Sequence, residues 1–171
     1  VIILGFIGLL TASILRSFQG TLERLIILAF YMPLLTSAGG NTGSQSATVV
    51  IRAMALNKLY PGDIVKVIRK EFLISTMLCI CLGLLTYLRV VMFPGSQNMV
   101  SEFSLKSIAF LVSLSLSIQV IWSTIFGAVI PMIATKIKLD PVVISSPALT
   151  TLVDMGGIAI YFTTAKLILG I

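Results

Sequence analysis

A polar, glycine-rich stretch directly follows an apolar run near the start of the chain. Nearly every residue from Thr36 to Thr48 is small, hydroxylic or amide-bearing, although most of the chain around it is apolar. At 3.6 residues per turn, the longer polar side chains of this region fall on one helix face. They are Ser37, Asn41, Ser44, Gln45, Thr48 and Arg52. A polar stripe is costly in lipid, so we expect it to face water, another helix or an ion.

The remaining composition indicates one integral membrane domain over residues 1–171. Apolar residues make up 57% of the chain and charged residues only 11%, and the apolar runs are long enough for several bilayer crossings. The net charge is +6, but the basic residues are scattered between apolar runs, which fits membrane topology better than nucleic-acid binding. The chain has no histidine, the usual base of nucleophilic triads, so we expect no enzyme activity.

Apolar periodicity and turn residues predict an all-α fold with five transmembrane helices. The spans cover about 1–18, 22–56, 72–92, 105–135 and 141–169. If continuous, the second would be about 50 Å long and would exceed the hydrocarbon core of roughly 30 Å. It must therefore tilt, break near Gly39 and Gly40, or project beyond the membrane. Lys66, Arg69 and Lys70 before the third span predict a basic lead-in that lies on the membrane surface.

Individual residues mark where the predicted helices begin and bend. Asp63 is placed to cap a new helix, and Asp140 followed by Pro141 is a strong start signal for the last one. Gly127 and Pro131 predict a kink in the fourth span, which we interpret as structural rather than as a gate. Because the chain starts inside an apolar run without a basic flank, we read its first residues as the rest of a first span, not as a signal peptide. We expect it to be part of a longer protein.

The distribution of basic residues predicts the orientation in the membrane. The connections between spans two and three and between spans four and five carry seven basic residues: Arg52, Lys58, Lys66, Arg69, Lys70, Lys136 and Lys138. The opposite side has four: Arg16, Arg24, Arg89 and Lys106. Because basic residues concentrate on the cytoplasmic side, we expect the N-terminus in the cytoplasm and the C-terminus outside.

Asp154 is the acidic residue that lies deepest inside a predicted span. An isolated carboxylate there costs at least a few kcal/mol, so it indicates either an ion pathway or a protonated or hydrogen-bonded structural group. Thr150 and Gly157 share its helix face, which favours the ion pathway. Asn41, Gln45 and Thr48 would form the neutral half of that pathway, and interhelical hydrogen bonding is the alternative. We interpret Asp140 as a helix cap, and the alternative is an ion site at the cytoplasmic mouth of the pathway.

Two groups of residues, about 100 positions apart, carry a resemblance to a known family. The first comprises Pro33, Gly40-Asn41, Gly43, Gln45, Arg52 and Ala55. The second comprises Asp140-Pro141, Ser146-Pro147, Thr150-Thr151, Asp154, Gly157 and Tyr161-Phe162. The chain resembles the transmembrane domain of the MgtE magnesium channel family over essentially its whole length. It departs at Ala53, where the family more often has glycine, and it contains nothing like the family's soluble regulatory domains.

The resemblance implies a homodimeric channel with a central pore in the plasma or inner membrane, which conducts Mg²⁺ and other divalent cations down their gradient. Its partners would be Mg²⁺, membrane lipid and an upstream cytoplasmic regulatory domain. One Asp154 cannot balance two charges, but two copies across a two-fold axis can, and Mg²⁺ prefers oxygen ligands. The expected metal site comprises Asp154, Thr150, Gly157 and Asp140. The expected pore lining comprises Gly40, Asn41, Gly43, Ser44, Gln45, Thr48, Ser146 and Pro147.

Two other functions are compatible with the same residues. The first is a coupled transporter that exchanges Mg²⁺ for Na⁺ or H⁺, since intramembrane carboxylates also occur in transporters. The second is a module without transport activity, in which the polar faces only hold helices together. Asp154 argues against the second, because helix association does not need a carboxylate.

Overall fold

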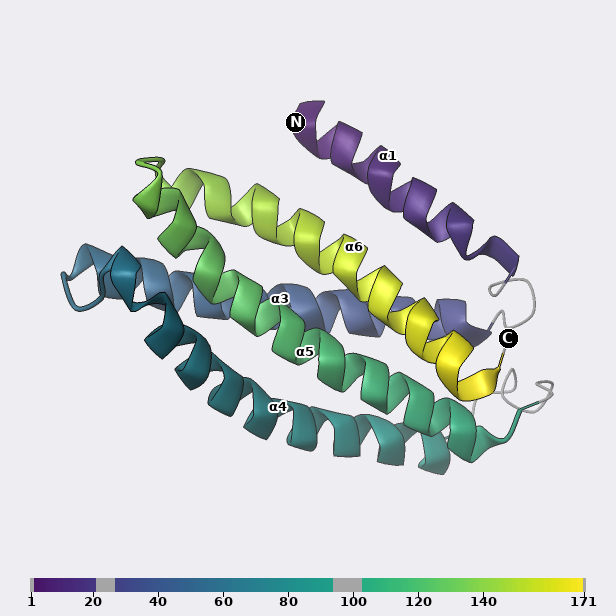
Figure 1. The fold of residues 1–171 in the computed structure, drawn as a ribbon. Helices are drawn as coiled ribbons and strands as arrows, with labels where there is room; N and C mark the ends of the chain where they lie inside the picture. The colour runs from purple at the N-terminus through teal and green to yellow at the C-terminus, as the bar shows by residue number, and fades with distance from the viewer. Residues whose placement is uncertain (1, 21–26, 94–102, 171) are drawn as a thin grey trace.

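The computed structural model describes residues 2–20, 27–93 and 103–170. In these ranges the chain forms long α-helices joined by short turns. They are α1 (Ile2–Ser17), α3 (Ile27–Ala55), α4 (Ile64–Met92), α5 (Leu105–Lys136) and α6 (Pro141–Leu169), with a short 3₁₀ helix, η1 (Pro61–Asp63), before α4. Figure 1 shows the helices alternating in direction, so that the α3–α4 and α5–α6 connections meet at one end of the bundle and the C-terminus lies at the other.

Helix α5 is the centre of the bundle. It packs against α3, α4 and α6, while α3 also packs against α6, and α1 lies along the outer side of α6 (Figure 1). The all-α fold expected from the sequence is therefore confirmed. Three of the described helical segments are long and apolar enough to cross a membrane: Pro61–Met92, Leu105–Lys136 and Pro141–Leu169.

The structure resolves two questions that the sequence left open about helix continuity. Helix α3 runs unbroken through Gly39 and Gly40 for 29 residues, or about 43 Å, so no break occurs there. The basic lead-in before residue 72 is not a separate segment, because it forms the first turns of the continuous helix α4. Residues 21–26, around the predicted start of the second span, lie outside the described residues, as do residues 94–102 between the third and fourth predicted spans.

The two predicted acidic caps differ. The carboxylate of Asp140 accepts a 2.8 Å hydrogen bond from the backbone N–H of Val142, and Pro141 is the first residue of α6, as predicted. Asp63 stands at the start of α4 but does not cap it with its side chain. Its carboxylate instead accepts a 3.1 Å bond from the N–H of Tyr60, because η1 intervenes and turns the side chain back.

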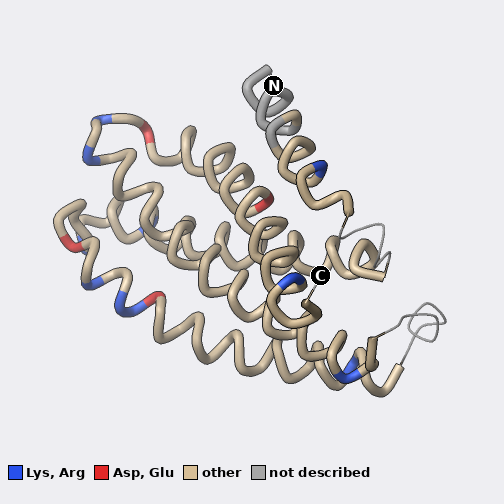
Figure 2. The backbone as a smooth tube through the Cα atoms, turned by 45° about the vertical axis from the view of Figure 1, so that its right-hand side comes forward, with Lys and Arg blue, Asp and Glu red and all other residues tan. Residues whose placement is uncertain are grey.

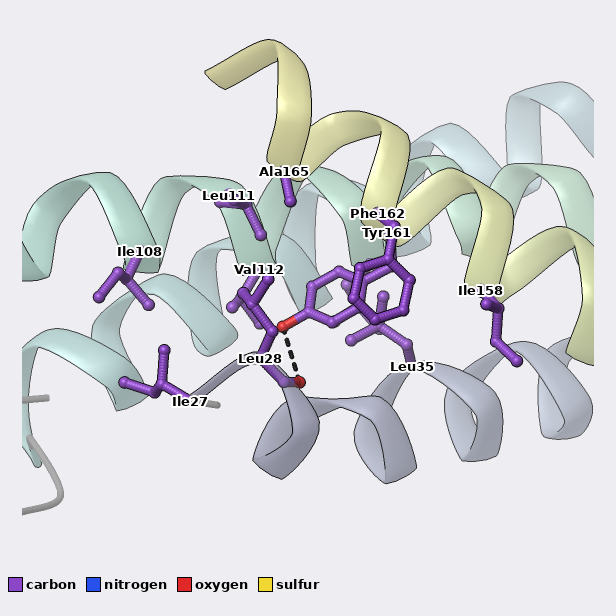
Figure 3. Packing of buried hydrophobic residues seen from close by; sticks show 11 residues of the cluster. Ile27, Leu28, Leu35, Ile108, Leu111, Val112, Ile158, Tyr161, Phe162 and Ala165 are labelled. Atoms are coloured by element: carbon purple, nitrogen blue, oxygen red, sulfur yellow. Dashed lines mark hydrogen bonds between the residues drawn. The ribbon is translucent and has the colours of Figure 1, made fainter. Parts of the chain in front are cut away.

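A cluster of buried apolar side chains joins α3, α5 and α6 (Figure 3). Its largest members include Tyr161 and Phe162 of α6, which lie against Leu28 and Leu35 of α3. The Tyr161 hydroxyl donates a 3.1 Å hydrogen bond to the backbone carbonyl of Leu28. Lipid tails are as apolar as these side chains, so in a membrane close packing and interhelical hydrogen bonds hold the helices together.

Glycines allow α3 and α5 to approach closely. A Cβ atom built on Gly127 of α5 would overlap the backbone of Gly43 of α3. The two backbones therefore meet where neither residue has a side chain, as is typical of small-residue contacts between membrane helices. The contact between Gly43 and Gly127 therefore positions the central helix against the polar stretch of α3. Helix α5 continues beyond this contact, through Pro131, to Lys136.

Candidate ion pathway

The polar stripe predicted on α3 is exposed along its whole length. Ser37, Asn41, Ser44, Gln45, Thr48 and Arg52 all have exposed side chains. Gly39, Gly43, Ala47 and Val50 form the buried side of the same helix. The 3.6-residue period therefore separates the helix into an apolar side within the bundle and a polar side outside it. In a single chain, this polar side has no covering helix among the described residues.

Helix α6 brings a second polar group to the same level of the bundle. A Cβ atom on Gly39 would lie 3.0 Å from Val153 Cγ1, and one on Gly43 would lie 3.1 Å from Leu149 Cδ1. These contacts place residues 39–43 of α3 beside residues 149–153 of α6. In this part of α6 Thr150 is exposed, and Asp154, which follows Val153, is half-buried. The carboxylate thus lies at the depth of the polar stripe.

Two hydroxyl groups on these surfaces have their protons engaged within their own helices. Thr48 donates to the carbonyl of Ser44 at 2.8 Å, and Thr150 donates to the carbonyl of Ser146 at 3.0 Å. A hydroxyl whose proton is engaged still has oxygen lone pairs that can accept. Such oxygens suit a cation or the hydrogen atoms of its bound water, whereas an anion would need donors.

Two glycines of the expected site lie on the inner side of their helices. Gly43 faces Gly127 and Ser123 of α5, and Gly157 is buried against Gln119. Gly40, in contrast, has open space where a side chain would be, beside the stripe. The expected set is therefore split between the exposed surface and the helix contacts behind it.

The other expected residues of α6 lie toward its start. Ser146 is exposed and Pro147 half-buried, about two turns before Asp154. Asp140 is exposed at the end of the bundle, about 21 Å from Asp154 along the helix axis. Asp140 and Asp154 of one chain therefore do not form a common site.

Gln119 is a buried polar residue for which the sequence suggested no role. It is 0% exposed, and its Nε2 atom donates a 2.9 Å hydrogen bond to the backbone carbonyl of Val153, next to Asp154. Cβ atoms on Gly39 and Gly157 would lie 2.6 and 2.8 Å from this Nε2 atom, so both glycines leave room for the amide. The sequence signal for this contact was a single glutamine in an otherwise apolar predicted helix, together with glycines in the two helices that the glutamine contacts.

A second carboxylate lies near the stripe and was also missed. Glu71 of α4 is only 6% exposed and accepts a 2.8 Å hydrogen bond from the hydroxyl of Ser46 on α3. Among the described residues, Ser46 is its one side-chain hydrogen-bond partner. A cavity of about 180 Å³ adjoins the pair and reaches Gln45 of the stripe. Thr42, Thr124 and Lys70 also line this cavity.

The charges of the described residues in one chain do not form a complete divalent site. Within the described ranges, no three His, Cys, Asp or Glu side chains gather in a way that could hold a metal ion. Asp154 therefore supplies one negative charge beside neutral oxygens, whereas Mg²⁺ carries two positive charges and prefers oxygen ligands.

The family model and the curated proteins that the chain matches all belong to one family of transporters. Residues 32–164 match the family model MgtE, described as a divalent cation transporter. The chain is 35% identical over 168 residues to the magnesium transporter MgtE of Thermus thermophilus, which covers 98% of this chain and 35% of that protein. It is also 35% identical over 164 residues to the magnesium transporter MgtE of Bacillus subtilis, covering 96% of this chain and 34% of that protein. The chain thus spans about a third of the length of the curated relatives it matches.

Proposed function

Because the chain belongs to the MgtE family of divalent cation transporters, we propose that it forms the membrane pathway of a Mg²⁺ channel. Divalent cations would pass through it down their electrochemical gradient. The observation that carries this proposal is the exposed polar stripe of α3 beside the half-buried Asp154 of α6. A polar surface of this size is costly against lipid, whereas it suits the wall of a water-filled pore.

The pathway would lie between two copies of the chain. Each copy leaves its stripe uncovered and supplies one carboxylate, so a two-fold axis beside α3 and α6 would cover the polar surface and pair two Asp154 side chains. Two carboxylates balance the charge of one Mg²⁺. Thr150 would bind the ion or its water beside Asp154. Asn41, Ser44, Gln45 and Thr48 would line the pore with Gly40 and Ser146, backed by Gly43, Pro147 and Gly157.

All five long helices would span the membrane, including α1 and α3. Helix α3 carries the polar stripe, and a pore-lining helix needs only one apolar side. More of the basic residues lie at the end that carries the α3–α4 and α5–α6 connections than at the opposite end (Figure 2), and this end would face the cytoplasm of a plasma or inner membrane. Asp140 would then stand at the cytoplasmic mouth. One-sided labelling of cysteines introduced at residues 57–70 and 94–104, in a variant without Cys79 and Cys81, tests this orientation, since labelling of both from one side would contradict it.

An ion-coupled transporter is the second candidate, and Glu71 favours it. A buried carboxylate beside a polar cavity offers a place for a coupling cation such as Na⁺ or H⁺, separate from Asp154. In that case Mg²⁺ movement would require an opposing gradient. A Glu71→Gln variant would lose this dependence, although it keeps an acceptor for Ser46.

Ion flux into liposomes that contain the purified protein distinguishes the candidates. A channel predicts uptake of Mg²⁺ with no Na⁺ or pH gradient, and a panel of Mg²⁺, Mn²⁺, Co²⁺ and Ca²⁺ measures its selectivity. Uptake that appears only with an opposing Na⁺ or H⁺ gradient would establish the transporter. Protein that is folded and dimeric but moves no divalent ion under either condition would contradict both.

A further inference from the structure

An open groove lies over the first turns of α4. Its volume is about 610 Å³, and Lys66, Arg69 and Lys70 line it together with Val65 and Leu73. All five of these side chains are exposed. The groove therefore combines three cationic groups with an apolar floor on the surface of one helix.

The protein offsets the positive charges in this groove only in part. Asp63, the one acidic residue that lines it, supplies a single negative charge against three positive ones, and its carboxylate accepts the backbone N–H of Tyr60. In the part of the chain that the structure describes, Lys66, Arg69 and Lys70 form no ion pair and no side-chain hydrogen bond. Three cations at helical spacing with free donors match an anion that has several oxygens, and the fork of an arginine matches a phosphate.

The surface of α4 beyond the groove is apolar. Leu73, Met77, Ile80 and Leu84 follow each other at three- and four-residue intervals and are 67%, 73%, 64% and 58% exposed. From Leu73 to Leu84 this stripe extends about 16 Å, close to the thickness of one leaflet, half of a hydrocarbon core of about 30 Å. A cluster of basic side chains, followed by an apolar stripe about as long as one leaflet is thick, complements a lipid with an anionic headgroup.

We propose that this groove binds an anionic phospholipid. Its phosphate and charged headgroup contact Lys66, Arg69 and Lys70, and its acyl chains lie along Leu73, Met77, Ile80 and Leu84. An acidic protein segment would match the charges but would leave the apolar stripe without a role. Anionic lipids are concentrated in the cytoplasmic leaflet, the side to which the distribution of basic residues assigns this end of the bundle.

The chain contains a matched control for simple charge attraction. Lys136 and Lys138 are exposed at the same end of the bundle, but they lie at the C-terminal end of α5 and do not line the groove. A lipid held only by the general positive charge of this end would respond to either pair of positions. A lipid held in the groove would respond to Lys66, Arg69 and Lys70 alone.

Native mass spectrometry of the purified protein with defined lipids tests the proposal. Phosphatidylglycerol and phosphatidylcholine are offered in equal amounts to the parent, to Lys66→Gln/Arg69→Gln/Lys70→Gln and to Lys136→Gln/Lys138→Gln. We expect the parent to retain phosphatidylglycerol preferentially. The triple variant should weaken this binding by about a hundredfold, or roughly fivefold for each basic side chain, while the double variant stays within about twofold of the parent.

Three outcomes of the lipid experiment would overturn the proposal. They are equal retention of both lipids by the parent, unchanged retention by the triple variant, and a loss in the double variant as large as in the triple one. Inorganic phosphate serves as the probe for a free-anion site, since its retention without lipid at comparable concentration would assign the groove to a soluble anion. Single Lys66→Gln and Arg69→Gln variants give partial losses if the triple variant fails to fold. Because the readout is lipid binding, the result does not depend on ion flux.

Discussion

The side-chain amide of Gln119 donates a 2.9 Å hydrogen bond to the backbone carbonyl of Val153, the residue before Asp154. Gln119 belongs to the central helix α5 and is fully buried, and Val153 belongs to the helix that carries the proposed pore carboxylate. The bond therefore fixes α6 against α5 at the level of Asp154. Its geometry depends on Gly39 and Gly157, which leave space for the amide on either side.

We expect Gln119→Leu to keep the fold but to disturb the pore site. Leucine has a similar volume and cannot donate to Val153, so the loss of stability should be about 0.6–1 kcal/mol. The loss of this anchor should shift the Mg²⁺ concentration for half-maximal flux more than it lowers the maximal flux. Thermal unfolding and flux against Mg²⁺ concentration measure the two effects.

Ser115→Ala is the control for that substitution. The hydroxyl of Ser115 is also buried in α5, but it has no hydrogen-bond partner among the described residues. Its removal should be neutral or slightly stabilising, because no bond is lost and no partner is left unpaired. A Gln119→Leu protein with the same stability and the same flux curve as Ser115→Ala would show that the amide positions nothing.

Gly40 and Gly43 should respond differently to leucine, although both belong to the polar stretch. A Cβ atom on Gly43 would lie 3.0 Å from the carbonyl oxygen of Ser123, whereas one on Gly40 would meet nothing within 4 Å. We expect Gly43→Leu to cost about 1–3 kcal/mol of stability through overpacking. Gly40→Leu should fold normally and reduce flux, because its side chain would project beside the stripe. Normal flux through folded Gly40→Leu would remove that position from the pathway.

The sequence predicted the features that depend on one helix at a time. The period of 3.6 residues grouped Ser37, Asn41 and Thr48 on one side of α3, and the structure leaves that side exposed. Asp140 and Pro141 identified the start of α6, because capping involves only residues close in the chain. Local geometry also accounts for Cys79 and Cys81, which lie two residues apart in α4, because such residues point in different directions and one is buried while the other is exposed.

The features that were missed depend on which helices are neighbours. Thr150, Asp154 and Gly157 follow a single helical spacing, but Gly157 is buried against α5 while Thr150 stays exposed. The Ser46–Glu71 and Gln119–Val153 bonds join residues that lie far apart in the chain. Periodicity gives the relative direction of side chains in a helix, but it does not give the helix that covers them.

The substitution Tyr161→Phe should weaken helix packing without changing ion conduction. The Tyr161 hydroxyl bonds to the carbonyl of Leu28 inside the apolar cluster and does not reach the exposed stripe. Its removal leaves the ring packing intact and should cost about 1 kcal/mol. We expect a lower unfolding temperature and unchanged Mg²⁺ flux per folded protein. A strong loss of flux at full folding would show that the α3–α6 contact also controls the pathway.

The charge of Asp154 is the feature on which the proposed pore depends most. A divalent ion in a low-dielectric span has a large self-energy, which hydroxyl and amide dipoles alone offset only in part. Two carboxylates on a dimer axis would supply the remaining field. The neutral oxygens of Asn41, Gln45 and Thr150 would stay in place if the carboxylates were removed, so charge and shape can be varied separately.

We therefore expect Asp154→Asn to keep dimer assembly and to lose most divalent conduction. Asparagine preserves the shape and two polar atoms of the side chain, so the packing of α6 should survive. It removes one charge per chain, and hence two from a site on a two-fold axis. Mg²⁺ flux into liposomes, with dimer content measured by cross-linking, tests this. Unchanged flux through an intact Asp154→Asn dimer would assign Asp154 a structural role and place the pathway along another surface.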